Sequence, residues 1–193
     1  MKNELYPIFV KVAELNVLIV GGGNVGLEKS FFMLKSSPNA RIEIVSLDFH
    51  EDLIALAKKH EKNVTLTQRA YGTDLLEKRH LVIACTDNIE VNKQVYYECK
   101  ERFTLVNIAD TPQYCDYYLG GIVTKGNVKV AISTNGKSPT MAKRLRQLFE
   151  EVLPEDMDEV VQNLNEYRKT LKGDFEYKVD QMNEITKTFI EKK

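Results

Sequence analysis

The first two thirds of the chain alternate short apolar runs rich in β-branched residues with longer amphipathic segments. This alternation predicts an α/β fold in which helices cover a parallel sheet. The expected strands lie at residues 16–20, 41–45, 64–69, 81–85 and 105–108, and the expected helices at 24–35, 51–59 and 88–102. The first strand carries the run VLIV, which is typical of a strand buried on both faces. We therefore predict a doubly wound sheet, since its crossovers are long enough for right-handed parallel connections.

The pattern changes after residue 110, where extended runs at 120–124 and 128–133 flank the sequence KGN. Two extended runs joined by a short turn that contains glycine predict a β-hairpin. A helix is expected after Ser138, a favourable N-cap residue, with Pro139 in the first helical position. Apolar residues then recur at helical spacing as far as Val152.

Pro154 ends this predicted helix, and a highly charged tail with an apolar stripe follows at 156–193. One or two further helices are expected in the tail. A length of 193 residues suits one main domain with a smaller appendage. We predict a main α/β domain at 1–115, a hairpin-and-helix segment at 116–153 and a C-terminal helical module at 154–193.

The charge of the chain is balanced, with 27 Lys and Arg against 28 Asp and Glu. No global field therefore draws it to nucleic acid or to an anionic membrane. The N-terminal residues mix Lys2, Glu4, Lys11 and Glu14 with apolar residues, and they lack the uninterrupted apolar run of a signal peptide or a membrane span. We expect a cytoplasmic protein.

The three cysteines, Cys85, Cys99 and Cys115, are odd in number and widely spaced, and they form no C-x-x-C pair. This spacing indicates neither a disulfide framework nor a zinc site, so we interpret them as reduced and mostly buried thiols. The histidines at positions 50, 60 and 80 stand in charged surroundings and are expected to face solvent. No metal ligand is predicted.

The strand at 16–20 runs into the sequence VGGGNVG, which contains the pattern G-x-G-x-x-G at Gly21, Gly23 and Gly26. The pattern follows a buried strand and opens an amphipathic helix, as in dinucleotide-binding sites. Gly21 can make the tight turn, Gly23 leaves room for a pyrophosphate, and Gly26 lets the helix approach the strand. With Asn24 and Val25 they form the expected pyrophosphate site at a helix N-terminus. The alternative is a glycine-rich turn without a ligand.

An acidic residue about 20 positions after the glycines usually holds the adenosine ribose. Glu43 falls within the second strand and can point away from the site. Ser46, Leu47 and Asp48, just past that strand, are the better-placed ribose contacts. No basic cluster stands there for a 2′-phosphate, so the sequence favours NAD over NADP.

Two further strands end in polar residues at the edge where doubly wound sheets bind ligands. Thr86 and Asp87 follow the fourth strand and are candidate cofactor contacts, although Asp87 or Asn88 can also cap the next helix. Asp110 follows the fifth strand and is a candidate general acid or base beside the nicotinamide. An aspartate before Thr-Pro is also an ordinary turn residue.

A second polar loop, STNGKSP at 133–139, ends at a helix N-terminus and precedes a basic stretch. Such a loop can hold substrate carboxylates. Its Gly-Lys-Ser sequence resembles a P-loop only superficially, because Ala131 stands where that motif needs glycine. The expected substrate-binding residues are Thr134, Asn135, Gly136, Lys137, Ser138, Lys143 and Arg144.

Taken together, the chain resembles the precorrin-2 dehydrogenase family, which also forms the N-terminal module of siroheme synthases and in some members acts as a sirohydrochlorin ferrochelatase. The segments that carry this resemblance are Tyr6 to Val10, Val17 to Gly26, Ala84 to Asp87, Val106 to Asp110 and Val130 to Pro139. The resemblance implies a Rossmann-like domain and an NAD-dependent oxidation of precorrin-2 to sirohydrochlorin.

The resemblance also implies roles for particular residues and partners. Asp110 matches the proposed catalytic aspartate of the family, and in a bifunctional member it also helps insert Fe²⁺ into the product. Family members are homodimers, and residues 117–153 match the segment that builds their interface. Precorrin-2 carries eight carboxylates, which suits the basic start of the helix after Ser138.

Two alternative functions are compatible with parts of the same sequence. A non-catalytic NAD-sensing regulatory domain shares the glycine turn, but it has no counterpart of the 133–139 loop. A chelatase with a vestigial dinucleotide site is the other alternative, and the intact glycines argue against it.

Overall fold

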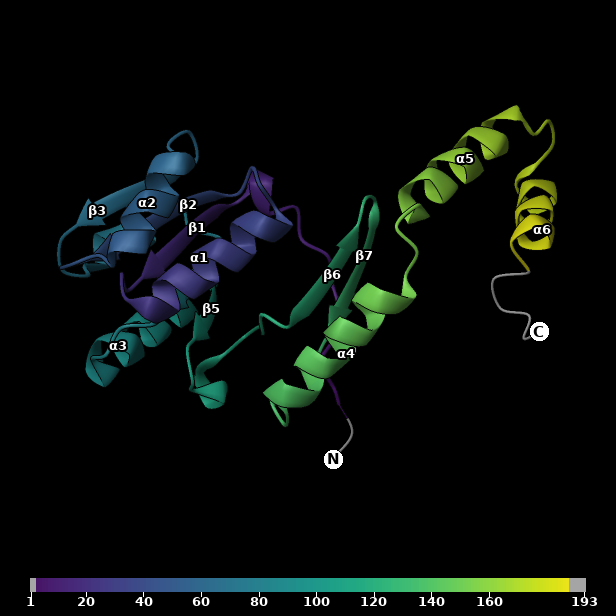
Figure 1. Ribbon diagram of the computed structural model, residues 1–193. Coiled ribbons are helices and arrows are strands. Elements are labelled where there is room, and N and C mark those ends of the chain that lie inside the picture. The colour runs from purple at the N-terminus through teal and green to yellow at the C-terminus, as the bar shows by residue number, and fades with distance from the viewer. Residues whose placement is uncertain (1–2, 188–193) are drawn as a thin grey trace. The chain divides into compact units, whose positions relative to one another are not determined.

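The computed structural model describes residues 3–187 and divides the chain into two compact units, with the boundary between Leu119 and Gly120 (Figure 1). The finer division at 115/116 and 153/154 stays a prediction. Within residues 3–187, no helix is both long enough and apolar enough to cross a membrane.

The first unit contains a five-stranded sheet whose neighbouring strands all pair in parallel, in the order β3-β2-β1-β4-β5. The strands are β1 Asn16–Val20, β2 Arg41–Ser46, β3 Val64–Gln68, β4 Leu81–Ala84 and β5 Leu105–Ile108. Each strand begins and ends within one residue of its predicted bounds. The predicted doubly wound sheet is thus confirmed.

Helices cover both faces of this sheet (Figure 1). Helices α1 (Asn24–Ser36) and α2 (Glu51–Lys59) pack on one face, and α3 (Ile89–Glu101) with the short 3₁₀ helix η2 (Thr73–Leu76) on the other. Each face of the sheet has its own hydrophobic core, and the side chains of β1 point alternately into the two cores. Each residue of its VLIV run is at most 2% exposed. Burial on both faces is what that run predicts.

The histidines lie at the ends of secondary-structure elements. His50 is the N-cap of α2, and its Nδ1 accepts a hydrogen bond of 3.1 Å from the Asp52 amide. His80 is exposed, and its Nδ1 accepts a hydrogen bond of 3.0 Å from the Asn16 amide at the start of β1. The side chains of His50 and His80 therefore help to begin a helix and a strand.

The second unit begins with an antiparallel hairpin of β6 (Gly121–Lys125) and β7 (Val128–Ile132), followed by α4 (Pro139–Val152), α5 (Met157–Thr170) and α6 (Phe175–Thr186). The hairpin, the helix start at Ser138 and two further helices are confirmed. The Ser138 hydroxyl caps α4 by accepting a hydrogen bond of 3.1 Å from the Met141 amide. Residues 188–193 of the predicted tail lie outside the described residues.

Two further 3₁₀ helices, η1 (Val12–Glu14) and η3 (Pro112–Tyr114), complete the secondary structure of residues 3–187. All three 3₁₀ helices escaped the sequence prediction, because three or four residues are too few to show a periodicity.

Candidate functional site

The polar segments predicted to bind a dinucleotide lie along one edge of the sheet. All five strands are parallel, so the residues that follow β1, β2, β4 and β5 are all found at the carboxyl edge. The chain continues from β1 toward β2 on one side, whereas β4 and β5 lie on the other side of β1. The boundary between β1 and β4 is therefore the topological switch point, where open α/β sheets bind their ligands.

The turn after β1 places three glycines where side chains do not fit. Gly21 has φ +127°, and its amide donates a 2.9 Å hydrogen bond to the Val45 carbonyl. A Cβ on Gly26 would lie 2.1 Å from the Gly21 carbonyl oxygen. A Cβ on Gly22 would lie 2.4 Å from the carbonyl oxygen of Asp48. The sequence reading assigned no role to Gly22, whose need for a bare Cα arises from a residue 26 positions away.

Gly23 differs from its neighbours, because it is exposed and a Cβ there would meet nothing within 4 Å. It is the N-cap of α1, where no side chain accepts a hydrogen bond, and the first turn of the helix carries no acidic residue. The first amide groups of α1 are thus left without a side-chain acceptor beside open space. This arrangement fits the pyrophosphate of a dinucleotide, an anion that such a helix N-terminus attracts.

The loop after β2 follows the same edge of the sheet. The Leu47 carbonyl accepts a hydrogen bond of 2.9 Å from the Gln68 side chain, and the Ser46 carbonyl accepts one of 3.0 Å from the Arg69 amide. These bonds fix the backbone of the predicted ribose segment. Arg69 is a cation beside this segment that the sequence reading overlooked, and its guanidinium is paired with Asp74.

Glu43, the acidic residue of β2, is engaged elsewhere. Its carboxylate accepts a hydrogen bond of 2.7 Å from Thr67 and pairs with the Arg79 guanidinium. Burial alone raises the pKa of Glu43, but the Thr67 hydroxyl and the Arg79 charge outweigh burial and bring the pKa below its usual 4.5. The carboxylate therefore serves the fold.

Replacing Glu43 with glutamine is expected to reduce the free energy of unfolding at pH 7 by about 1 to 3 kcal/mol, because Arg79 loses a partly buried partner. A carboxyl whose pKa is lowered by folding stabilises the protein above its unfolded pKa and loses that effect as the pH falls through the folded pKa. The difference in the free energy of unfolding between the wild type and Glu43→Gln should thus shrink below about pH 4.5. Thermal unfolding of both proteins from pH 7 to pH 3 measures it, with exposed Glu51→Gln as control. An equal loss of stability in Glu43→Gln at every pH would contradict a stabilising role for the ionised Glu43 carboxylate.

Thr86, after β4, is held by a buried asparagine that the sequence reading missed. The Thr86 hydroxyl donates to Oδ1 of Asn92 at 2.7 Å, and Nδ2 of Asn92 donates to the Thr86 carbonyl at 2.9 Å. Asn88 is the N-cap of α3, since its side chain accepts a hydrogen bond of 2.9 Å from the Glu90 amide. Asp87 is exposed and does not cap α3, so it can face a ligand.

Asp110 is exposed just beyond β5, in the left-handed backbone region at φ +56°. The segment behind it is tied to β5, the edge strand of the sheet. The Asp116 amide donates to the Val106 carbonyl at 2.8 Å, and the Val106 amide donates back to the Asp116 carboxylate at 3.1 Å. Lys100 donates to the same carboxylate at 2.5 Å. These bonds hold the turn that presents Asp110.

Replacing Asp116 with alanine is expected to lower the free energy of unfolding by about 1 to 3 kcal/mol, because it leaves the buried Val106 amide without an acceptor. Asp116→Asn is the matched control: it keeps an acceptor oxygen and gives up an exposed ion pair with Lys100, worth at most about 1 kcal/mol. Urea unfolding of the full chain measures both variants. Equal stability of the alanine variant and the wild type would show that Asp116 does not hold this turn.

The three cysteines, one of which lies beneath the glycine turn, are unreactive thiols. Cys85 is buried, its Sγ lies 3.7 Å from the Gly21 carbonyl oxygen, and burial raises the pKa of the thiol to about 12. Cys99 is buried as well, and burial raises its pKa to about 12. Cys115 is half-buried, and all three are free thiols as predicted. Their protonated sulfurs are poor nucleophiles.

The predicted substrate loop belongs to the second unit. Asn135 and Gly136 both have positive φ, at +54° and +70°, and the Lys137 amide donates to the Thr134 carbonyl at 3.0 Å. The loop is therefore a tight turn that leads into α4, whose first turn has no acidic residue. The remaining candidate cations, Lys143 and Arg144, are exposed on α4.

Comparison with known proteins finds a family match in each of the two units. Residues 8–121 match the NAD(P)-binding family, and residues 125–151 match the central region of sirohaem biosynthesis proteins. The siroheme synthase of Nitrosococcus oceani is 33% identical over 169 residues, which are 88% of this chain and 35% of that protein. The siroheme synthase of Pseudoalteromonas translucida is 34% identical over 177 residues, 92% of this chain and 37% of that protein.

The chain thus spans only about a third of the length of these relatives. A solved structure described as SirC, precorrin-2 dehydrogenase has the same fold, with a TM-score of 0.73 at 22% identity. The match covers 94% of this chain and 89% of that chain.

Proposed function

Because the chain belongs to the NAD(P)-binding family, we propose that it binds NAD at the Gly21 to Gly26 turn and oxidises precorrin-2 to sirohydrochlorin. The observation that carries the proposal is the open, uncapped helix N-terminus at Gly23, on the same sheet edge as Asp110. The similarity to siroheme synthases supports the tetrapyrrole substrate.

The choice of NAD over NADP rests on the segment after β2. Ser46, Leu47 and Asp48 offer a hydroxyl and a carboxylate for a ribose, and the carboxylate of Asp48 would repel a 2′-phosphate. Arg69 is the nearby cation, and its guanidinium is already paired with Asp74. NAD should therefore support turnover far better than NADP.

In the proposed reaction the macrocycle loses a hydride from carbon and a proton. Bound NAD supplies the hydride acceptor. The Asp110 carboxylate accepts the proton, for which its exposure at the carboxyl edge of the sheet suits it. The amide groups at the start of α1 hold the pyrophosphate, and Thr86 and Asp87 border the same edge. We assign Lys137, Lys143 and Arg144 of the second unit to the carboxylates of the substrate.

The test is anaerobic incubation of the purified protein with precorrin-2 and NAD, following NADH and sirohydrochlorin by absorbance. The expected result is formation of both products at a one-to-one ratio, and much slower turnover with NADP. NADH formation no faster than in the enzyme-free control would overturn the proposal and favour a regulatory NAD-sensing domain.

We further propose that the chain acts as a homodimer. Helix α4 exposes the apolar side chains of Met141, Leu148 and Val152, which are 52%, 51% and 64% exposed. A row of this kind is typical of a surface that a protein partner covers. Light scattering after gel filtration should give a mass near twice 22.1 kDa.

Two further assignments rest on the resemblance and on the free thiols. Fe²⁺ is proposed as a second substrate that enters sirohydrochlorin, and an assay with Fe²⁺ and purified sirohydrochlorin decides this activity. The cytoplasm is the proposed compartment, because the three cysteines are free thiols and the cytoplasm keeps thiols reduced.

A further inference from the structure

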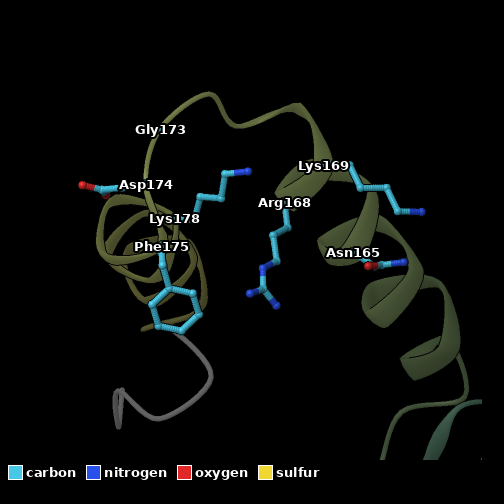
Figure 2. Close-up of a pocket in the computed structure, with 7 residues that line it drawn as sticks. All are labelled: Asn165, Arg168, Lys169, Gly173, Asp174, Phe175 and Lys178. Carbon is cyan, nitrogen blue, oxygen red and sulfur yellow. The ribbon is translucent and has the colours of Figure 1, made fainter.

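A hollow of about 520 Å³ lies between α5 and α6 of the second unit (Figure 2). This volume falls within the range of roughly 300 to 1,000 Å³ that is typical of small-molecule sites. The residues that line it are Asn165, Arg168, Lys169, Gly173, Asp174, Phe175 and Lys178. None of them has a role in the proposed dehydrogenation.

The lining is strongly cationic. Arg168, Lys169 and Lys178 form no ion pair within residues 3–187. Figure 2 shows Arg168 and Lys178 extending from the two helices into the space between them, while Asp174 points away. The Asp174 carboxylate is occupied as the N-cap of α6, where it accepts a hydrogen bond of 2.9 Å from the Tyr177 amide. Unpaired cations that face one hollow favour an anionic ligand.

The arrangement suits carboxylates on a ring better than a compact phosphate. A guanidinium binds a carboxylate or a phosphate with two parallel hydrogen bonds, and an ammonium adds a point charge, so these cations set the sign of the ligand's charge. Phe175, which is 70% exposed at the hollow, offers an apolar surface to the body of a ring. The Asp174 carboxylate caps the start of α6, so the amide groups there, a common phosphate site, already have an acceptor.

We propose that this hollow is a second binding site, specific for a polycarboxylate, and that it captures carboxylate side chains of the tetrapyrrole. The identity of the ligand rests on the proposed function, whereas the site itself rests on its lining. Captured carboxylates raise the affinity of the enzyme for its substrate without taking part in hydride transfer. Loss of the site should therefore raise KM and leave kcat unchanged.

The test uses the full chain and uroporphyrin III, a stable porphyrin with eight carboxylates, with binding followed by porphyrin fluorescence. The double variant Arg168→Ala with Lys178→Ala is expected to bind the porphyrin about tenfold more weakly, because two charge-assisted contacts are lost. The control is Lys62→Ala with Lys172→Ala, which removes two exposed charges that do not line the hollow. Equal affinity of the double variant and this control would overturn the proposal.

Two further arms separate the possible ligands and the two proposals. Pyrophosphate that displaces the porphyrin from the wild type at lower concentration than citrate would identify a phosphate site and overturn the polycarboxylate assignment. Weaker porphyrin binding by the double variant supports the site even where precorrin-2 yields no NADH. If the double variant oxidises precorrin-2 with an unchanged KM, the proposed second site is wrong and the proposed function still holds.

Discussion

Asp110→Asn is expected to lower kcat for the oxidation of precorrin-2 by about a hundred- to ten-thousandfold, the usual contribution of general acid–base catalysis. The amide cannot accept the proton that leaves with the hydride. Asparagine is the right replacement, because Asp110 has φ +56° and asparagine tolerates the left-handed region. The turn should therefore keep its shape, and the dissociation constant for NADH should stay within about twofold of the wild type.

Single-turnover absorbance measures the chemical step of this variant, and NADH fluorescence measures its cofactor affinity. Asp180→Asn, on the exposed surface of α6, is the control and should retain full activity. Turnover of Asp110→Asn within threefold of the wild type would remove Asp110 from the mechanism. A large loss of NADH affinity would instead mean that Asp110 supports the cofactor site.

Alanine at Gly23 should weaken NAD binding and alanine at Gly26 should lower stability, although the two residues belong to one motif. At Gly23 the methyl group enters open space, so the protein should fold normally, yet the group takes room meant for the pyrophosphate. Loss of one hydrogen bond to a charged group costs about 1.5 to 3 kcal/mol, so NAD affinity should fall roughly tenfold to a hundredfold. At Gly26 the methyl group would lie 2.1 Å from the Gly21 carbonyl oxygen, so the turn must shift. Overpacking of this kind costs about 1 to 3 kcal/mol of stability.

Isothermal titration with NADH and thermal unfolding of the same preparations test this contrast. Gly23→Ala should show a Tm close to the wild type and weak binding, and Gly26→Ala should show a lowered Tm. Gly120→Ala is a useful comparison in the second unit, because its Cβ would lie 2.2 Å from the Ile132 carbonyl oxygen and far along the chain from the turn. Unchanged NADH affinity in Gly23→Ala would show that the pyrophosphate lies elsewhere.

Local patterns were enough to predict the strands, the glycine turn and the start of α4. Periodicity along the chain sets which face of a strand or helix is buried, and a cap such as Ser138 acts within three residues of itself. The parallel direction of the strands was then expected from crossovers long enough for right-handed connections. Because the carboxyl ends share an edge, the sequence also predicted that Asp110 and the glycine turn lie on that edge.

What the sequence alone determined about this protein is therefore the doubly wound sheet and the polar segments at its carboxyl edge. The tertiary structure decided which residues have partners far along the chain. Glu43 pairs with Arg79, and Gly22 must lack a Cβ because the Asp48 carbonyl lies beside it. Asp116 holds the turn that carries Asp110. It also brought α5 and α6 together around a cationic hollow. These contacts join residues distant in the chain or on different elements, and no periodicity encodes them, because they depend on how whole elements pack.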